Sequence, residues 1–277
     1  MKKLLSAIIH VILFVLLTFL TQIGGIVWLI SVLLHPIVAR RLKFPAGMVK
    51  FFVFSVLYLI STFALVPVLA KPFGRVPLPL FSENHIRPVS VWTCILNRNY
   101  VRPELKRVLE TVAGNMAGQF ADTEIRYLDA SLPFMNGFPL LPHLSHNDGC
   151  KLDLAYFYTD RKTGKPTNLQ PAFSGYGVFE GPRTGENNTT EMCLEKGYWQ
   201  YDYSKYLTLG SDPEKYVFDE VRTRAMIGLF AAQASVQKMF LEPHLKSRMG
   251  LNAIEKIGFQ GCRAVRHDDH LHIQMRD

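Results

Sequence analysis

Two long uncharged stretches at the N-terminus constrain this chain more than any other feature. Residues 4–39 form a run of 36 without a fixed charge, and residues 51–70 form a second run of 20 dominated by Phe, Val, Leu and Ile. A helix of about 20 apolar residues crosses a hydrocarbon core about 30 Å thick. A cleaved signal peptide has a shorter apolar core and is not followed by a second span. We therefore expect a retained transmembrane anchor over residues 1–70.

The basic residues between the two runs predict the orientation of the anchor. Four of them separate the runs: Arg40, Arg41, Lys43 and Lys50. The positive-inside rule places such a loop, at about residues 40–50, in the cytoplasm. The chain after Lys71 is then expected on the outer, periplasmic side of a bacterial cytoplasmic (inner) membrane. The first run is either one long tilted helix or a hairpin broken at Gly24-Gly25. We favour one helix, because two spans of 18 residues without a polar turn would be cramped.

The net charge of +8 does not indicate a nucleic-acid partner, because it is concentrated in the anchor. Residues 1–70 contain six Lys or Arg and no Asp or Glu, which leaves 25 bases and 23 acids for the other 207 residues. Nucleic-acid binding relies on a basic surface that neutralises phosphates. The part of the chain outside the anchor has the charge balance of an ordinary soluble domain.

The chain after the anchor is expected to form a connector and one α+β domain. Residues 71–88 contain four prolines, which suits an extended connector. Residues 89–277 are long enough for a single domain with a substantial core. A helix is expected over residues 103–120, with strands over 123–132, 151–158 and 270–275. Residues 159–210 are expected to be loop-rich. The S-x-x-E pattern at Ser211 predicts the start of a long helix that reaches about Phe240.

Four cysteines follow the anchor, at Cys94, Cys150, Cys193 and Cys262. An even number in an oxidising compartment makes two disulfides reasonable, although buried thiols are the alternative. Sequence alone does not choose among the three possible pairings. We favour Cys150 with Cys262, because each lies beside one of the histidine-rich motifs described next.

Five of the nine histidines fall in two short clusters, HLSH (143–146) and HDDHLH (267–272). On a strand, alternate residues share a face, so His270 and His272 lie together while Leu271 and Ile273 face the core. Asp153, between Leu152 and Leu154, is placed in the same way on another expected strand. Two acid-bearing histidine clusters mounted on core-anchored strands indicate a metal site. The loop between His146 and Asp153 is expected to turn at Gly149.

These two motifs resemble those of a family of zinc peptidases. SHNDGCKLD (145–153) matches the S-H-x(2)-G-x(3)-D pattern of the D-alanyl-D-alanine carboxypeptidases, the penicillin-insensitive murein endopeptidase and the hedgehog amino-terminal domain, and HLH (270–272) matches their later H-x-H. The closest resemblance is to the murein endopeptidase, which has further histidines three residues before each motif, as His143 and His267 are here. HDDHLH also lacks the glutamate base of the carboxypeptidases.

The resemblance implies a role for each of these residues and a fold. His146, Asp153 and His272 would bind Zn²⁺, His270 would act as general base or acid, and His143 and His267 would line the site. The fold implied is a zinc peptidase domain with a central antiparallel sheet. Asp268 and Asp269 are candidates to orient imidazole N–H groups, with exposed acids in a turn as the alternative.

The implied activity is hydrolysis of peptide bonds in peptidoglycan cross-links by a membrane-anchored zinc metallopeptidase. The alternatives are a D-alanyl-D-alanine carboxypeptidase and a non-catalytic zinc-stabilised module that binds wall peptide or a partner protein. Residues 159–210 have no counterpart in the family. Their aromatic residues Trp199, Tyr201 and Tyr203 would either form a groove wall or, as we favour, pack beneath a loop. Arg126 is a weaker candidate for binding a substrate carboxylate.

Overall fold

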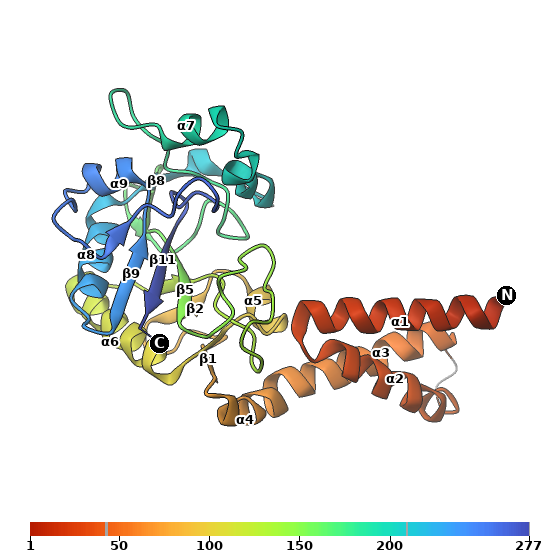
Figure 1. Cartoon of the computed structure of the whole chain (residues 1–277). Coiled ribbons are helices and arrows are strands. Elements are labelled where there is room, and N and C mark those ends of the chain that lie inside the picture. The colour runs from red at the N-terminus through yellow and green to blue at the C-terminus, as the bar shows by residue number, and fades with distance from the viewer. Residues whose placement is uncertain (42–43, 209, 277) are drawn as a thin grey trace.

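The computed structural model describes residues 1–41, 44–208 and 210–276. A projecting group of apolar helices within residues 1–70, here called the anchor after its expected role, precedes an α+β domain (Figure 1). Lys43, one of the bases used to orient the anchor, and Asp277 lie outside the described residues. The expected α+β class is confirmed.

The anchor contains three main helices, and the expectation of a single helix over residues 4–39 is wrong. Helix α1 (Lys2–Thr21) is followed by an antiparallel α2 (Gly24–Ala39), and α3 (Ala46–Ile60) runs back to the domain through the π-helical turn η1 (Ser61–Leu65) and α4 (Val66–Leu69). The glycines explain how α2 packs so close to α1. A Cβ on Gly25 would lie 2.0 Å from Thr18 Oγ1 and 2.5 Å from the Phe14 carbonyl oxygen. Small residues permit such close helix contacts.

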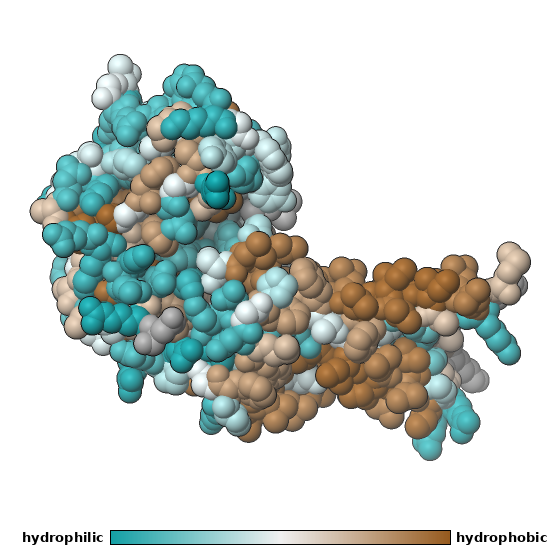
Figure 2. Space-filling view, viewed as in Figure 1, coloured by the Kyte–Doolittle hydropathy of each residue, from teal (hydrophilic) through white to brown (hydrophobic). Residues whose placement is uncertain are grey.

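Two helical stretches of the described chain are long and apolar enough to cross a bilayer, Lys3–Thr21 and Ala46–Leu69. Helix α2, with 16 residues, is shorter. Most of the anchor's large apolar side chains are exposed. Figure 2 shows this surface as a continuous hydrophobic band with hydrophilic residues at its free end. The N-terminus, the end of α2 and the start of α3 all lie at that free end, away from the domain (Figure 1).

The segment expected to be a connector contributes structure to the domain. After the short helical turn η2 (Lys71–Phe73), β1 (Val76–Pro77) pairs with β3 (Tyr100–Val101), and β2 (Ile86–Pro88) pairs with β4 (Ile125–Tyr127). Ile86 and Leu78 are buried in the main core. Pro88 ends a strand at the edge of the sheet, where the missing N–H leaves no gap in the ladder.

A six-stranded sheet forms the centre of the domain, in the order β10-β9-β11-β5-β4-β2. The strands not yet defined are β5 (Lys151–Ala155), β9 (Val236–Phe240), β10 (Ile257–Gly258) and β11 (His270–Met275). The three central pairings are antiparallel, but both outer pairings, β10–β9 and β2–β4, are parallel. The sheet is therefore mixed, not antiparallel throughout as expected.

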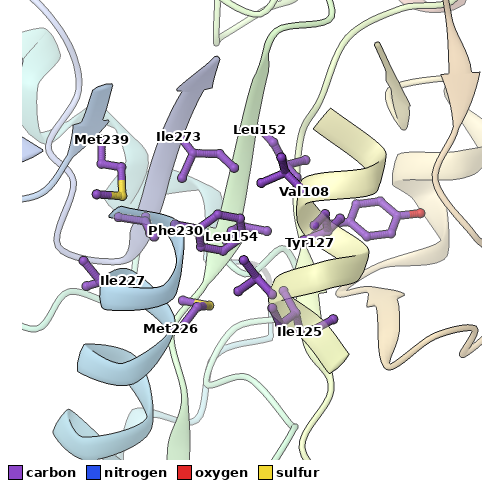
Figure 3. Packing of buried hydrophobic residues seen from close by; sticks show 14 of the residues in the cluster. Val108, Ile125, Tyr127, Leu152, Leu154, Met226, Ile227, Phe230, Met239 and Ile273 are labelled. Atoms are coloured by element: carbon purple, nitrogen blue, oxygen red, sulfur yellow. The ribbon is translucent and has the colours of Figure 1, made fainter. Parts of the chain in front are cut away.

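The hydrophobic core lies between this sheet and two helices, α6 (Pro103–Gln119) and α8 (Glu220–Ala231) (Figure 3). Helix α6 was predicted within one residue of its observed end, and its buried face includes Val108, Leu109 and Val112. Leu152, Leu154 and Ile273 point from β5 and β11 into the same core and are fully buried. Because these side chains face the core, the alternate side chains of β5 and β11 face the other side of the sheet.

The long helix expected from Ser211 to about Phe240 does not form. The chain instead makes the short turn η4 (Pro213–Lys215), strand β8 (Tyr216–Phe218), α8 and β9. Strand β8, with its alternating aromatic residues, pairs with β6 (Tyr158–Asp160). Strand β6 also pairs with β7 (Pro166–Thr167), and the three strands form a small second sheet. Helix α8 is capped by Asp219, whose side chain accepts a hydrogen bond from the Arg222 N–H at 3.0 Å.

The expected strand over 123–132 is also shorter, because regular pairing in β4 covers only Ile125–Tyr127. The remaining elements are α5 (Val91–Ile95), α7 (Thr189–Glu195), η3 (Trp199–Leu207) and α9 (Pro243–Arg248). Helices α7 and η3 lie within the region expected to be loop-rich.

Candidate metal centre

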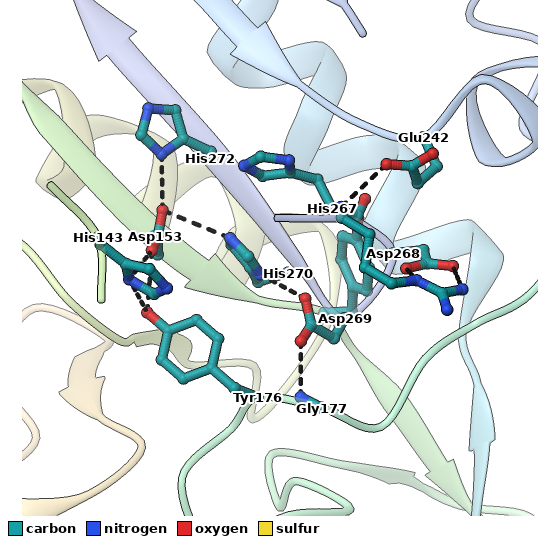
Figure 4. A network of polar contacts seen from close by, with 12 residues as sticks. His143, Asp153, Tyr176, Gly177, Glu242, His267, Asp268, Asp269, His270 and His272 are labelled. Carbon is teal, nitrogen blue, oxygen red and sulfur yellow. Dashed lines mark hydrogen bonds and ion pairs between the residues drawn. The ribbon is translucent and has the colours of Figure 1, made fainter. Parts of the chain in front are cut away.

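Strand pairing brings the two sequence motifs together. In the antiparallel register of β11 and β5, His272 lies opposite Asp153, and their side chains project from the face of the sheet that does not carry the core. His272 Nδ1 lies 2.8 Å from Asp153 Oδ1 (Figure 4). Both residues are almost fully buried, and each has core residues on either side of it in its strand.

His146 reaches the same point from the loop before β5. Its Nδ1–H donates a hydrogen bond to the Ala130 carbonyl oxygen at 3.0 Å, which leaves Nε2 directed at the other two residues. The loop turns at Gly149, as predicted, with φ of +77°, and a Cβ there would lie 2.6 Å from the Arg75 guanidinium. Glycine is the residue that tolerates both conditions.

Three ligand-type atoms form a tight triangle at this point. His146 Nε2 lies 3.1 Å from His272 Nδ1 and 3.2 Å from Asp153 Oδ1, and the third side is the 2.8 Å contact between Asp153 and His272. A set of two imidazoles and one carboxylate is one that catalytic zinc uses, with a fourth position left open. Burial lowers the pKa of His272 to about 4, which keeps its imidazole in the neutral form that a metal requires.

His143 adds a fourth candidate donor, since one ligand atom each from His143, His146 and Asp153 fit within 4.8 Å of one another. Its Nδ1, however, lies between two carboxylates, 3.1 Å from Asp153 and 3.2 Å from Asp129. Burial opposes the charged imidazole, but these hydrogen bonds raise the pKa of His143 to about 10. The triangle with His272 is tighter, with sides of 2.8 to 3.2 Å, and we therefore take His146, Asp153 and His272 as the better ligand set.

His270 is oriented by Asp269. Its Nδ1–H donates to Asp269 Oδ1 at 2.5 Å, and the second oxygen of that carboxylate accepts the Gly177 N–H at 2.6 Å (Figure 4). This leaves His270 Nε2 at 3.6 Å from Asp153 Oδ1, beside the triangle. Burial opposes protonation, yet Asp153 and Asp269 together raise the pKa of His270 above its ordinary value. The ring is placed to exchange a proton with a group bound next to the metal position.

The His267 ring lies beside those of His270 and His272, with ring centroids 4.9 and 5.7 Å away. Its backbone N–H donates to Glu242 Oε1 at 3.1 Å, and burial holds its pKa well below the usual range. The adjacent Asp268 does not orient an imidazole of the site. It accepts two hydrogen bonds from Arg266, at 2.7 and 2.5 Å. Asp268 and Asp269 are both buried, so neither is an exposed acid in a turn.

A cavity of about 790 Å³ opens onto the triangle. Besides the six histidine and aspartate residues of the site, it is lined by residues from four places: the loop before β5 (Leu141, Pro142, Leu144 and Ser145), η3 (Trp199, Gln200 and Tyr203), β9 (Phe240) and the 260–265 segment, including Arg263. Trp199 and Tyr203 therefore line the groove, whereas Tyr201 is buried against Phe259. Arg126 lies away from the cavity on β4 and pairs with Glu124.

One disulfide holds the outer wall of this cavity. Cys193 of α7 bonds to Cys262, with their Cα atoms 5.2 Å apart, so the preferred pairing of Cys150 with Cys262 is wrong. Cys150 lies at the start of β5 within the main core, and Cys262 lies in the loop that lines the cavity. Cys94 is likewise a buried thiol. The bond joins two segments of the cavity's surroundings instead of the two metal motifs.

The sequence reasoning missed several residues that support the site. Arg98 binds both oxygens of Asp129, at 2.7 and 2.6 Å, and thereby orients the carboxylate that faces His143. Tyr176 donates to Asp153 Oδ2 at 2.9 Å and accepts the Asp129 N–H at 3.2 Å. Neither Asp129 nor Tyr176 belongs to a histidine motif. The one available signal was an acid within an otherwise apolar segment, YLDASL.

No protein-family model matches the chain, and a search of curated proteins finds no match. The geometry of the site and the two sequence motifs therefore carry the functional argument.

Proposed function

We propose that this protein is a zinc metallopeptidase that hydrolyses peptide bonds in peptidoglycan cross-links while anchored in the cytoplasmic membrane of a bacterium. The observation that carries the proposal is the triangle of His146 Nε2, Asp153 Oδ1 and His272 Nδ1, with sides of 2.8 to 3.2 Å, at the floor of a cavity large enough for a peptide. The match to the H-x-H and S-H-x(2)-G-x(3)-D motifs supports the same reading.

These residues fit a metal ion by the chemistry of their donors. His146 Nδ1–H is committed to a backbone carbonyl, so its Nε2 lone pair is free to bind. His146, Asp153 and His272 would hold the ion. Zinc in such a site polarises a carbonyl group and lowers the pKa of water to about 7.

The chain's own residues supply proton transfer and positioning. Asp269 fixes the His270 tautomer with the proton on Nδ1, so His270 Nε2 can accept a proton from water and deliver it to the leaving amine. Charged His143, whose Nδ1 is held between Asp129 and Asp153, would donate a hydrogen bond from Nε2–H to developing negative charge. Its Nε2 has no hydrogen-bond partner among the described residues.

The anchor supports the proposed location. The hairpin of α1 and α2 puts the N-terminus and the Arg40-Arg41 pair at the same end of the anchor (Figure 1). With Lys3 they form a basic cytoplasmic end under the positive-inside rule, and the domain then lies on the periplasmic side.

A carboxypeptidase is the second candidate, because Arg263 lines the cavity and a guanidinium pairs well with a free C-terminal carboxylate. The two activities differ in their products. Purified full-length protein in detergent would be incubated with intact sacculi, and soluble fragments and free alanine would be measured by mass spectrometry.

Conversion of cross-linked peptide dimers to monomers without free alanine is the expected result. Release of alanine alone would replace the endopeptidase with the carboxypeptidase. No product from a folded, zinc-loaded protein would favour the non-catalytic binding module.

A further inference from the structure

The loop that carries the first metal-binding motif rests on the end of the anchor. In this loop (133–148, the ligand loop), the Phe134 N–H donates to Gln22 Oε1 at 2.9 Å, in the connection between α1 and α2. The Phe138 ring lies 6.3 Å from the Phe19 ring. Phe134 also packs against a small cluster that includes Val66 and Ala70 at the end of the anchor. The loop that carries His143 and His146 is therefore in direct contact with the anchor.

In a bilayer spanned by α1, these contacts would place the ligand loop at the membrane surface. Helix α1 has 20 residues, and at about 1.5 Å per residue it is about 30 Å long, the thickness of the hydrocarbon core. Its end at Thr21 then marks the outer boundary of the core. Phe19 lies in the last turn of α1, so Phe138 sits at that boundary.

The ligand loop also exposes apolar side chains that no part of the described chain covers. Met135, Leu141 and Leu144 are 59%, 52% and 56% exposed. Figure 2 shows hydrophobic surface continuing from the anchor onto the adjoining part of the domain. Apolar side chains next to membrane-spanning helices gain free energy by entering the interfacial layer of the bilayer, in proportion to the area removed from water.

The same loop forms one side of the cavity mouth. Leu141 and Leu144 line the cavity together with His143 and His146. Across the cavity, Trp199 is 70% exposed and Tyr203 contacts Tyr206, which is also 70% exposed. Trp and Tyr are the side chains enriched at membrane–water interfaces. The mouth of the cavity is therefore bordered by residues suited to the headgroup layer.

We propose that the ligand loop lies in the headgroup layer of the outer leaflet, so that the cavity takes wall peptide from a chain still tethered to a membrane lipid. This inference rests on the proposed peptidase function and on the membrane placement of the anchor. It adds a substrate class: lipid-tethered peptide is preferred to the same peptide free in solution.

The lipid contact is tested without any activity measurement. Full-length Met135→Cys protein, labelled with a nitrobenzoxadiazole fluorophore, would be reconstituted in nanodiscs with nitroxide-labelled lipid. The control is Val221→Cys, because Val221 is 69% exposed on α8, on the side of the domain away from the anchor (Figure 1). We expect quenching at position 135 to exceed that at position 221 by roughly two-fold or more if the loop lies in the interface. Equal quenching would overturn the proposal.

The substrate preference is tested with one synthetic cross-linked wall peptide, with and without a palmitoyl chain, on wild-type protein in vesicles. Tethering raises the effective concentration at the cavity, and we expect a rate at least about 10-fold higher for the palmitoylated peptide. Met135→Glu should lower the rate on that peptide by roughly 3- to 10-fold, since a charge opposes insertion, and leave the rate on free peptide and the zinc content unchanged. Val221→Glu introduces the same charge on the far side and should change neither rate.

Equal rates on the two peptides, or equal effects of the two Glu variants, would overturn the substrate preference. Hydrolysis of neither peptide, with strong quenching at position 135, would overturn the proposed peptidase activity and leave the lipid contact standing. The two failures are therefore distinguishable.

Discussion

The floor and the outer wall of the cavity are held in place by different means. The floor consists of β5 and β11, which are paired over five residues and backed by fully buried Leu152, Leu154 and Ile273. The outer wall consists of η3 and the 260–265 segment. It is held by the Cys193–Cys262 disulfide and by contacts such as that of Arg266 with Asp202 at 3.0 Å.

The proposed metal-binding and proton-transfer residues are therefore held differently from the residues that border the cavity entrance. Asp153, His270 and His272 project from a packed sheet, which holds their mutual distances, and His146 is held beside them by its hydrogen bond to Ala130. The outer-wall residues that line the cavity lie on segments with little regular structure, which tolerate change. Variants of the floor should therefore alter metal binding and turnover, whereas variants of the wall should alter stability and substrate affinity.

The largest effect is expected on the floor, from His270→Asn. Loss of the proton-transfer group should lower kcat by about 10²- to 10⁴-fold, with zinc content unchanged, because His270 is outside the ligand triangle. Steady-state kinetics and elemental analysis of the same sample measure both quantities. His85→Asn, at an exposed histidine on the domain surface, is the matched control and should retain wild-type kcat. Zinc loss in His270→Asn would show that this residue is a ligand.

A variant of the outer wall should lose stability and keep its zinc, and the double variant Cys193→Ala/Cys262→Ala tests this. Removing a disulfide that spans 69 residues should lower the free energy of unfolding by about 2–4 kcal/mol. Thermal unfolding monitored by fluorescence would show the loss, while KM rises more than kcat falls. A variant that loses its zinc would contradict the separation between wall and floor.

A smaller effect on the floor is expected from Asp269→Asn. Asp269 does not contact the proposed metal position but orients His270, and such supporting groups typically contribute about 10- to 100-fold. The pH profile distinguishes orientation from a purely structural role. Loss of the carboxylate lowers the pKa of His270, so the corresponding limb of the kcat–pH profile should shift to lower pH. An unchanged profile would refute the orienting role.

The smallest effect concerns Glu180, which lies outside both regions. Burial raises the pKa of its carboxyl group from 4.5 to about 7. The folded state then binds more protons than the unfolded state between these values, so stability falls as pH rises from about 4.5 to about 7. Glu180→Gln should remove this slope and, above pH 7, stabilise the protein by about 1–3 kcal/mol. Melting temperatures of both proteins from pH 4.5 to 8 provide the check, and parallel curves would contradict it.

Local signals in the sequence predicted some elements well. Alternation of histidine with apolar residues predicted β11 with its observed bounds, and apolar spacing after Pro103 predicted α6. Both predictions depend on the spacing of apolar residues within one element, and the observed fold keeps that element as the spacing predicts. The register that sets His272 opposite Asp153 is a long-range pairing, and no local pattern specifies it.

The errors arose where tertiary contacts outweighed a local pattern. The helix expected from Ser211 is interrupted because Tyr216–Phe218 pairs with β6. The single helix expected over residues 4–39 is broken because glycines let α2 pack against α1. Proximity to the metal motifs did not identify the disulfide, since Cys150 belongs to the core and Cys262 to the wall.

Zinc content of the purified protein tests the central claim most directly. Full-length protein in detergent is the appropriate sample, because the ligand loop contacts the anchor through Gln22 and Phe19. Elemental analysis should give about one zinc per chain for wild type and His85→Asn, and almost none for His146→Ala or Asp153→Ala. No zinc in folded wild-type protein after incubation with the metal, or full zinc in His146→Ala, would contradict the account.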